Sequence, residues 1–183
     1  VLEHPDPKTL DGLRDRAILE LVYSSGLRNY EICNLRVEDV DFEESTVFVR
    51  KAKCRAQRIL PVGKKALEAM WKYFRKARPK FARNRREDHF FLTIIGDPMK
   101  DPSVRYCVLR HRVATPRTDK LTVHGLRHAM ATNMVRNNSN LVAVKEMLGH
   151  TRLSSTQLYT HLITDDLDKA HQKHHPRSSV YTK

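Results

Sequence analysis

The sequence predicts a mainly α-helical α+β domain with a small three-stranded antiparallel sheet. Hydrophobic residues make up 40% of the 183 residues and only six residues are glycine, which is typical of a globular and mostly helical protein. One stretch, residues 37–62, is instead rich in β-branched residues, which favour strands. A chain of this length can form one domain with a sizeable core, so we expect residues 1–183 to be a single domain.

The first two predicted elements are helices. Hydrophobic residues fall near helical spacing at Leu10, Leu13, Ala17, Leu21 and Val22. The sequence Ser-Ser-Gly at residues 24–26 can end that helix, because glycine readily adopts the left-handed conformation that follows a last turn. A second, short helix is expected over residues 29–35.

A sheet and a third helix follow. Residues 37–62 are interrupted by Glu-Glu-Ser at positions 43–45, which predicts a short strand and then a hairpin across residues 46–62. Residues 63–77 return to helical spacing, with one face formed by Leu67, Met70, Phe74 and Ala77. The basic segment 78–88 is predicted to be a loop that is either solvated or in contact with phosphate.

The rest of the chain is predicted to be helical. The expected helices cover residues 102–113, 123–136, 140–148, 154–161 and 165–174. No internal repeat and no low-complexity linker divides the sequence.

The charge predicts an anionic partner. The 34 lysines and arginines against 21 acidic residues give a net charge of +13, which favours nucleic acid first and a membrane surface second. A well-solvated basic surface is the alternative. No apolar run reaches membrane-spanning length, and the first ten residues have no signal-peptide hydrophobic region. The three scattered cysteines, Cys33, Cys54 and Cys107, indicate a reduced, cytoplasmic setting.

Two pairs of polar residues lie where helices are expected to begin. His124 and Arg127 are three residues apart at a helix start, so both side chains point to one side of a positive helix end that suits an anion. Arg28 follows a glycine that ends a helix, and Glu31, three residues later, can fix the plane of its guanidinium group. Either pair could instead be ordinary, the first a chance spacing and the second a surface ion pair of little energetic value.

Two further residues lie near the end of the chain. His150 follows Gly149, which is expected to end a helix, and histidines at such a place commonly cap the helix. Tyr159 lies in the polar run LSSTQLYTHL, and an isolated tyrosine is more often a packing residue than a nucleophile. Each signal by itself is weak.

In combination, these residues resemble the tyrosine recombinase (phage integrase) family, and most closely its Xer-type members. The matching stretches are SGLRNYEICNL, RILPV, HGLRHAMAT, LGH and SSTQLYTH, and the spacing of nine residues from His150 to Tyr159 fits the family. The likeness covers nearly the whole chain. It implies the helical catalytic domain of a tyrosine recombinase and a site-specific DNA recombinase activity.

The resemblance also implies a role for each residue. Tyr159 would attack a DNA phosphodiester and form a 3′-phosphotyrosyl link, which leaves a free 5′-hydroxyl. Arg28 and Arg127 would hold the two non-bridging oxygens of the phosphate. His124 would hydrogen-bond the phosphate and help to manage the tyrosine proton, and His150 would donate a further hydrogen bond. Glu31 would orient Arg28.

A hairpin lysine would protonate the departing 5′-oxygen. The family's hairpin usually reads Gly-Lys-Gly-x-Lys before Arg-x-x-Pro, whereas this chain has KAKCRAQRILP without either glycine. Counting back five residues from Arg58 selects Lys53, and Lys51 and Arg55 share its face of the strand. A register error of two residues would therefore substitute another cation.

No cofactor and no metal are expected. The cationic side chains would take the place of the magnesium ion that usually accompanies a reacting phosphate, and the sequence has no carboxylate cluster that suits magnesium. A zinc site at His171, His174 and His175 is the less favoured alternative.

The expected partners are double-stranded DNA and other recombinase protomers in a tetrameric synaptic complex, with no membrane, in a cytoplasmic protein associated with the nucleoid. The tail, residues 165–183, is expected to dock on a neighbouring protomer or to pack on its own domain. The family's N-terminal DNA-binding domain is expected to be missing, so that the chain is a fragment. The alternatives are a type IB topoisomerase and a non-catalytic DNA-binding domain with helix-turn-helix-like spacing over residues 124–161.

Overall fold

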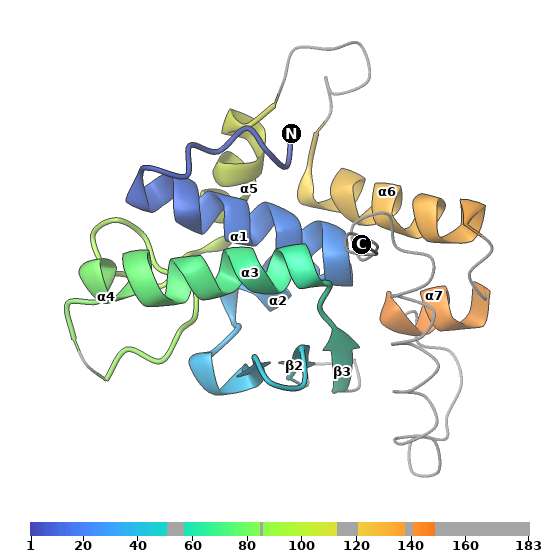
Figure 1. The fold of residues 1–183 in the computed structure, drawn as a ribbon, viewed down its shortest axis with the longest axis horizontal. Helices are drawn as coiled ribbons and strands as arrows, with labels where there is room; N and C mark the ends of the chain where they lie inside the picture. Colours follow the sequence, from blue (N-terminus) through green and yellow to red (C-terminus); the bar gives the residue numbers. More distant parts are fainter. Residues whose placement is uncertain (51–56, 85, 113–120, 138–140, 149–183) are drawn as a thin grey trace, which may run out of the picture.

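The computed structural model describes residues 1–50, 57–84, 86–112, 121–137 and 141–148 (Figure 1). Helix α1 (Leu10–Ser25) crosses the middle of this part and contacts α3, α5 and α6. Its start is capped by the Thr9 hydroxyl, which accepts a hydrogen bond from the Gly12 N–H at 3.1 Å. Its end is Gly26 in the left-handed conformation (φ 63°), as the sequence predicts. Residues on all sides of α1 are buried, so it is the central helix of the core.

The sheet has the predicted three antiparallel strands. They are β1 (Val40–Asp41), β2 (Thr46–Val49) and β3 (Arg58–Pro61), in the order β1-β2-β3. In the hairpin, Val49 pairs with Arg58 and Val47 with Leu60. The short 3₁₀ turn η1 (Val37–Asp39) leads into β1. The predicted lysine at position 53 lies outside the described residues.

Helix α3 (Lys64–Lys72) continues through a π-helical turn, Tyr73–Ala77, into α4 (Arg78–Phe81). The prediction of a loop over residues 78–88 is therefore wrong for its first four residues. Two tertiary contacts outweigh the local basic sequence. Phe81 is buried with its ring 6.5 Å from that of Tyr73, and the Arg78 guanidinium donates to the carbonyls of Glu87, His89 and Phe90.

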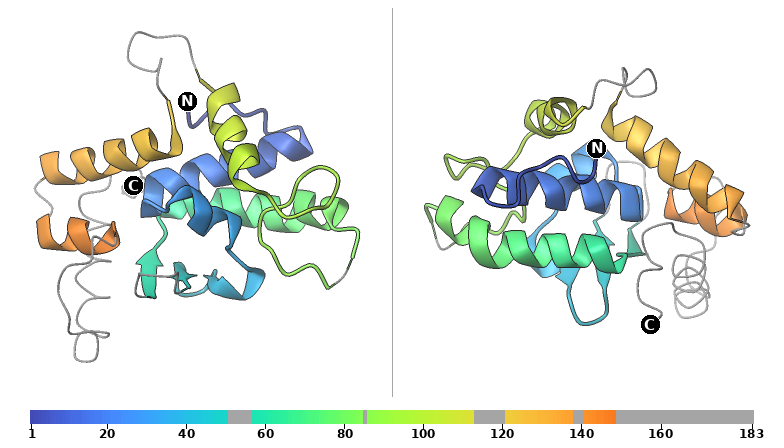
Figure 2. Two further views of the ribbon diagram at one scale, coloured as in Figure 1. Left: turned by 180° about the vertical axis from the view of Figure 1, so that it is seen from behind. Right: turned by 45° about the horizontal axis from the view of Figure 1, so that its top comes forward.

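The other described helices surround the ends of α1 (Figure 2). They are α2 (Asn29–Cys33), α5 (Asp101–Arg110), α6 (Val123–Arg136) and α7 (Leu141–Met147). Helix α2 contacts α5, and α6 contacts both α1 and α7. Helices α6 and α7 confirm the predictions for residues 123–136 and 140–148, and α5 confirms the helix predicted at residues 102–113 but ends earlier, at Arg110. The helices predicted at 154–161 and 165–174 lie outside the described residues.

A buried ion cluster fixes α5 against α1. Asp15 is fully buried and is contacted by Arg14 at 2.8 Å, Arg110 at 2.6 Å and His111 at 2.8 Å. Because Arg110 and His111 end α5, this cluster sets the position of the helix that forms one wall of the candidate site.

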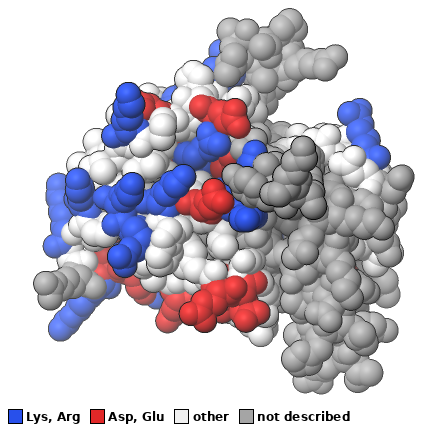
Figure 3. All heavy atoms as spheres, in the orientation of Figure 1, with Lys and Arg blue, Asp and Glu red and all other residues white. Residues whose placement is uncertain are grey.

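Charged side chains are unevenly distributed over the face that Figure 3 shows. In the orientation of Figure 1, lysines and arginines gather over α3 and α4, while acidic side chains gather below them (Figure 3). Within the described residues, no helix is both long and apolar enough to cross a membrane.

Candidate functional site

The start of α6 places two of the predicted residues. The Thr122 hydroxyl accepts a hydrogen bond from the Gly125 N–H at 2.9 Å and caps the helix. His124 and Arg127 then lie one turn apart and face the same pocket, as predicted. His124 is exposed, whereas only 5% of Arg127 is exposed.

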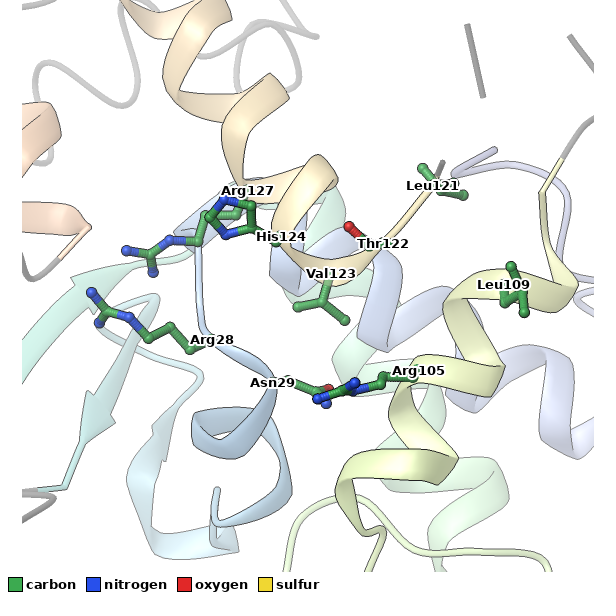
Figure 4. Close-up of a pocket in the computed structure, with 9 residues that line it drawn as sticks. All are labelled: Arg28, Asn29, Arg105, Leu109, Leu121, Thr122, Val123, His124 and Arg127. Atoms are coloured by element: carbon green, nitrogen blue, oxygen red, sulfur yellow. The ribbon is translucent and has the colours of Figure 1, made fainter. Parts of the chain in front are cut away.

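This pocket has a volume of about 520 Å³. It is lined by Arg28, Asn29, Arg105, Leu109, Leu121, Thr122, Val123, His124 and Arg127. Its cationic part comes from the α1–α2 junction, α5 and α6, and its apolar part from α5 and the start of α6. In Figure 4 the guanidinium groups of Arg28 and Arg127 extend in the same direction, with the His124 ring beside Arg127. Such a pocket suits an anion that carries an apolar substituent.

Arg127 also joins the ends of two helices. Its Nη1 donates to the carbonyl of Gly26, after α1, and its Nη2 donates to the carbonyl of Leu148, after α7. Glycine suits this junction because its φ of 63° lies in the left-handed region that residues with a Cβ rarely adopt. The position of Arg127 is thus fixed by backbone atoms from both helices.

Glu31 is the buried carboxylate of the site, with 1% of its side chain exposed. Its Oε1 lies 3.3 Å from Arg28 Nη1, and its Oε2 accepts from the Arg28 backbone N–H at 2.8 Å. The Tyr30 hydroxyl donates to Oε1 at 3.1 Å. These contacts fit the predicted orienting role of Glu31 toward Arg28, which remains a proposal below.

Arg58 completes the environment of Glu31, and sequence analysis used this residue only as a counting reference. Its Nη1 and Nη2 donate to the two carboxylate oxygens at 2.9 and 3.0 Å. Burial acts to raise the pKa of Glu31, but hydrogen bonds and charge from Arg58, followed by Arg28, outweigh it and hold that pKa below its ordinary value of 4.5. Glu31 is therefore an anion at neutral pH. The signal available in the sequence was Arg58 itself, in the family-like stretch RILPV.

Arg105 is a second residue that sequence analysis missed. It lines the pocket from α5 and pairs with Asp101 at 2.6 Å. Asn29, beside it, donates to the backbone carbonyl of Asp101 at 3.1 Å. No motif marked Arg105 in the sequence, because its relevance depends on how α5 packs against α2.

The structure thus brings together Arg28, Glu31, His124 and Arg127 from the predicted set. The other three predicted residues, Lys53, His150 and Tyr159, lie outside the described residues and stay predictions.

Within the described residues, one group could hold a metal ion, formed by Glu87, Asp88 and His89. None of the three lines the pocket, and exposed acidic groups of this kind are common without an ion. The predicted alternative zinc ligands, His171, His174 and His175, are outside the described residues.

Comparison with known proteins assigns the fold. A sequence model of the phage integrase family matches residues 2–165. The chain belongs to the phage integrase family. This confirms the resemblance inferred from the sequence motifs.

Known members of the phage integrase family are similar over most of the chain. Tyrosine recombinase XerC of Bacillus pumilus (strain SAFR-032) is 38% identical over 176 residues, which are 94% of this chain and 57% of XerC. The crystal structure of XerA recombinase has a TM-score of 0.69 at 28% identity and covers 90% of this chain and 59% of XerA. The structure of XerH site-specific recombinase bound to a difH substrate has a TM-score of 0.67 at 24% identity, over 90% of this chain and 48% of XerH, and supports the fold alone.

These likenesses confirm the predicted α+β fold class of the tyrosine recombinase type. The chain spans less than two thirds of the length of the curated relatives, for example 57% of XerC and 60% of XerD of Staphylococcus saprophyticus.

Proposed function

We propose that this chain is the catalytic domain of a site-specific DNA recombinase that cleaves and rejoins strands through a 3′-phosphotyrosyl intermediate. The main support is that Arg28, His124 and Arg127 line one pocket in a member of the phage integrase family. Arg28 and Arg127 are 99 residues apart in the sequence. The named Xer recombinases among its relatives support the same activity.

The proposed reaction exchanges one phosphodiester for another. The Tyr159 oxygen attacks phosphorus, the bond from phosphorus to the 5′-oxygen breaks, and a phosphotyrosyl ester forms. Lys53 gives a proton to the departing 5′-oxygen, while the tyrosine proton passes to His124, the group proposed to manage it. A 5′-hydroxyl from another strand then attacks and releases Tyr159. Because one phosphodiester is consumed and one is formed, no external energy source is needed.

The cations of the pocket would stabilise charge on the phosphate. Arg28 and Arg127 would hold the two non-bridging oxygens, on which negative charge grows in the pentacoordinate transition state. His124 and His150 would add hydrogen bonds to the same oxygens. Glu31 would keep the Arg28 guanidinium in a fixed plane, because it holds both the side chain and the backbone N–H of that residue.

The proposed partner is double-stranded DNA, in a synaptic complex of four protomers. The net charge of +13 favours a long polyanion over a small anionic substrate. The exposed side chains of Arg105 and Leu109 on α5, which line the pocket, would contact the same duplex.

A covalent capture experiment tests the proposal. A pool of nicked duplexes with randomised sequence is incubated with the protein, since a nick releases the short 5′-hydroxyl strand and prevents rejoining. We expect an SDS-resistant DNA adduct from the wild type, none from Tyr159→Phe, and DNA binding by both. Tyr106→Phe is the matched control, because Tyr106 is 65% exposed on α5, and it should keep the adduct. Adduct formation by Tyr159→Phe would assign the nucleophile to another residue.

A further inference from the structure

The Arg58 side chain extends from the sheet to Glu31 of the candidate site. It is the first residue of β3, opposite Val49 of β2, and its guanidinium meets Glu31 edge to edge at 2.9 and 3.0 Å. The Arg58 side chain is 15% exposed and that of Glu31 is 1% exposed. A bidentate ion pair in this setting is strong and fixes the angle between the guanidinium plane of Arg58 and the carboxylate plane of Glu31. Arg58 does not line the pocket, so its effect on a bound phosphate would be indirect.

The contacts of Glu31 with its two arginines are unequal. Arg58 binds both oxygens, whereas Arg28 Nη1 reaches only Oε1, at the longer distance of 3.3 Å. A lone buried carboxylate beside Arg28 would favour a close bidentate pair of its own. Arg58 therefore limits how tightly Glu31 can hold the Arg28 side chain, whose guanidinium extends in Figure 4 toward the same side as that of Arg127.

Arg58 also contacts the end of α7. Its Nε donates to the carbonyl of Met147 at 3.3 Å, and Arg127 donates to the next carbonyl, that of Leu148. The last carbonyls of a helix have no partner within the helix and carry partial negative charge, so cations bind them well. Arginines from β3 and α6 thus hold consecutive carbonyls at the end of α7. The second of these residues, Leu148, lies two positions before the predicted His150 in the sequence.

We propose that Arg58 is a positioning residue for DNA cleavage, which prevents Glu31 from capturing Arg28 and ties the hairpin to the end of α7. This inference rests on the proposed function. Lysine cannot replace Arg58 in this role. The planar guanidinium donates to both carboxylate oxygens and to a helix carbonyl at once, and an ammonium group does not have this geometry.

The test measures single-turnover cleavage of a captured nicked duplex by the full chain, at saturating DNA and well below the unfolding midpoint of every variant. We expect Arg58→Ala to cleave roughly 10- to 100-fold more slowly at saturation, the range found when outer partners of metal ligands are removed. The DNA concentration for half-maximal rate should change by less than about twofold, because Arg58 lies outside the pocket. Arg58→Lys should also be slow.

A second substitution separates positioning from general support of the fold. In Arg58→Ala, the added change Glu31→Gln removes the charge that would capture Arg28, so the double variant should cleave at least about threefold faster than Arg58→Ala alone. Arg50→Ala is the matched control. Arg50 leaves the same hairpin and pairs with Glu38 at 2.5 Å and Asp39 at 2.8 Å, outside the pocket, and its loss should leave the saturating rate within about twofold.

The outcomes are distinct. No adduct from the wild type overturns the proposed function itself. Cleavage by the wild type together with a wild-type rate for Arg58→Ala overturns the positioning role. A double variant that is as slow as Arg58→Ala, or slower, overturns the capture of Arg28. If Arg58→Ala does not fold, Arg58→Gln, which retains one donor to Glu31, takes its place in the same comparison.

Discussion

Glu31→Gln is the most direct test of the buried ion network. The carboxylate receives five hydrogen bonds, two from Arg58, two from Arg28 and one from the Tyr30 hydroxyl. Glutamine keeps one oxygen but places an amide N–H₂ where the other oxygen stood. That group would face the donors of Arg58 or the Arg28 backbone N–H, and neither can accept a hydrogen bond.

The magnitude follows from the burial of the partners. Removing one partner of a buried ion pair destabilises a protein by about 3–5 kcal/mol. Arg28 and Arg58 keep 18% and 15% of their side chains exposed, so water can partly solvate them after the change. We therefore expect Glu31→Gln to lower the free energy of unfolding by about 2–4 kcal/mol, and the midpoint by roughly 5–15 °C for a domain of this size.

The pH dependence has a defined sign. The pKa of Glu31 in the folded protein lies below the ordinary value of 4.5, so the unfolded chain takes up this proton first as pH falls. The stability that the ionised carboxylate supplies is complete above about pH 5.5 and is lost as pH falls through the folded pKa. Glutamine does not titrate, so the difference between wild type and variant should be constant near neutral pH and shrink below about pH 4.5.

Urea and thermal unfolding of both proteins at several pH values measure this difference. Glu38→Gln is the control, because Glu38 is a 69% exposed carboxylate paired with Arg50, and its midpoint should stay within about 2 °C of wild type. The reasoning is refuted if Glu31→Gln behaves like Glu38→Gln at pH 7. It is also refuted if the difference in free energy of unfolding between wild type and Glu31→Gln increases as the pH falls.

Two further predictions concern the cleavage step. Arg28→Lys should reduce adduct formation roughly a hundredfold to a thousandfold, nearly as much as Arg28→Ala, because lysine keeps the charge but loses the planar fork; a near wild-type rate would mean that Arg28 acts only through bulk charge. Lys53→Ala should be slow on normal DNA and substantially rescued by a bridging 5′-sulfur, a leaving group that needs little protonation, while Arg127→Ala should not be rescued. Equal rescue of both variants would remove Lys53 from the general-acid role.

Local signals in the sequence were sufficient for much of the fold. Helix α1 ends at Gly26 because the glycine adopts a left-handed conformation there, and this is readable from Ser-Ser-Gly. Helix α6 begins after Thr122, whose hydroxyl caps it, and the predicted start at residue 123 is confirmed. The failure at α4 has the opposite cause. Phe81 is helical through its burial against Tyr73, a tertiary contact that no local composition reveals.

The candidate site also contains residues that the sequence could predict and residues that it could not. His124 and Arg127 share a helix face, so their spacing alone predicted that they would meet one ligand. Arg58 is 27 residues from Glu31 in sequence, and only the position of β3 beside α2 makes them partners. The sequence shows an arginine at that place but cannot show which carboxylate it binds.

The arrangement of these contacts explains how arginines can be fixed in advance without losing their positive charge. Arg127 donates to two neutral carbonyls, which do not cancel its positive charge. Arg28 is held by a carboxylate, which alone would cancel its charge, but Arg58 shares that carboxylate and restores a net positive balance. Preorganised donors need little ordering when the phosphate arrives, which is the condition under which they stabilise a transition state best. A buried glutamate in a site for a polyanion is therefore consistent with anion binding here because a second arginine accompanies it, and loss of Arg58 should slow cleavage even though Arg58 lies outside the pocket.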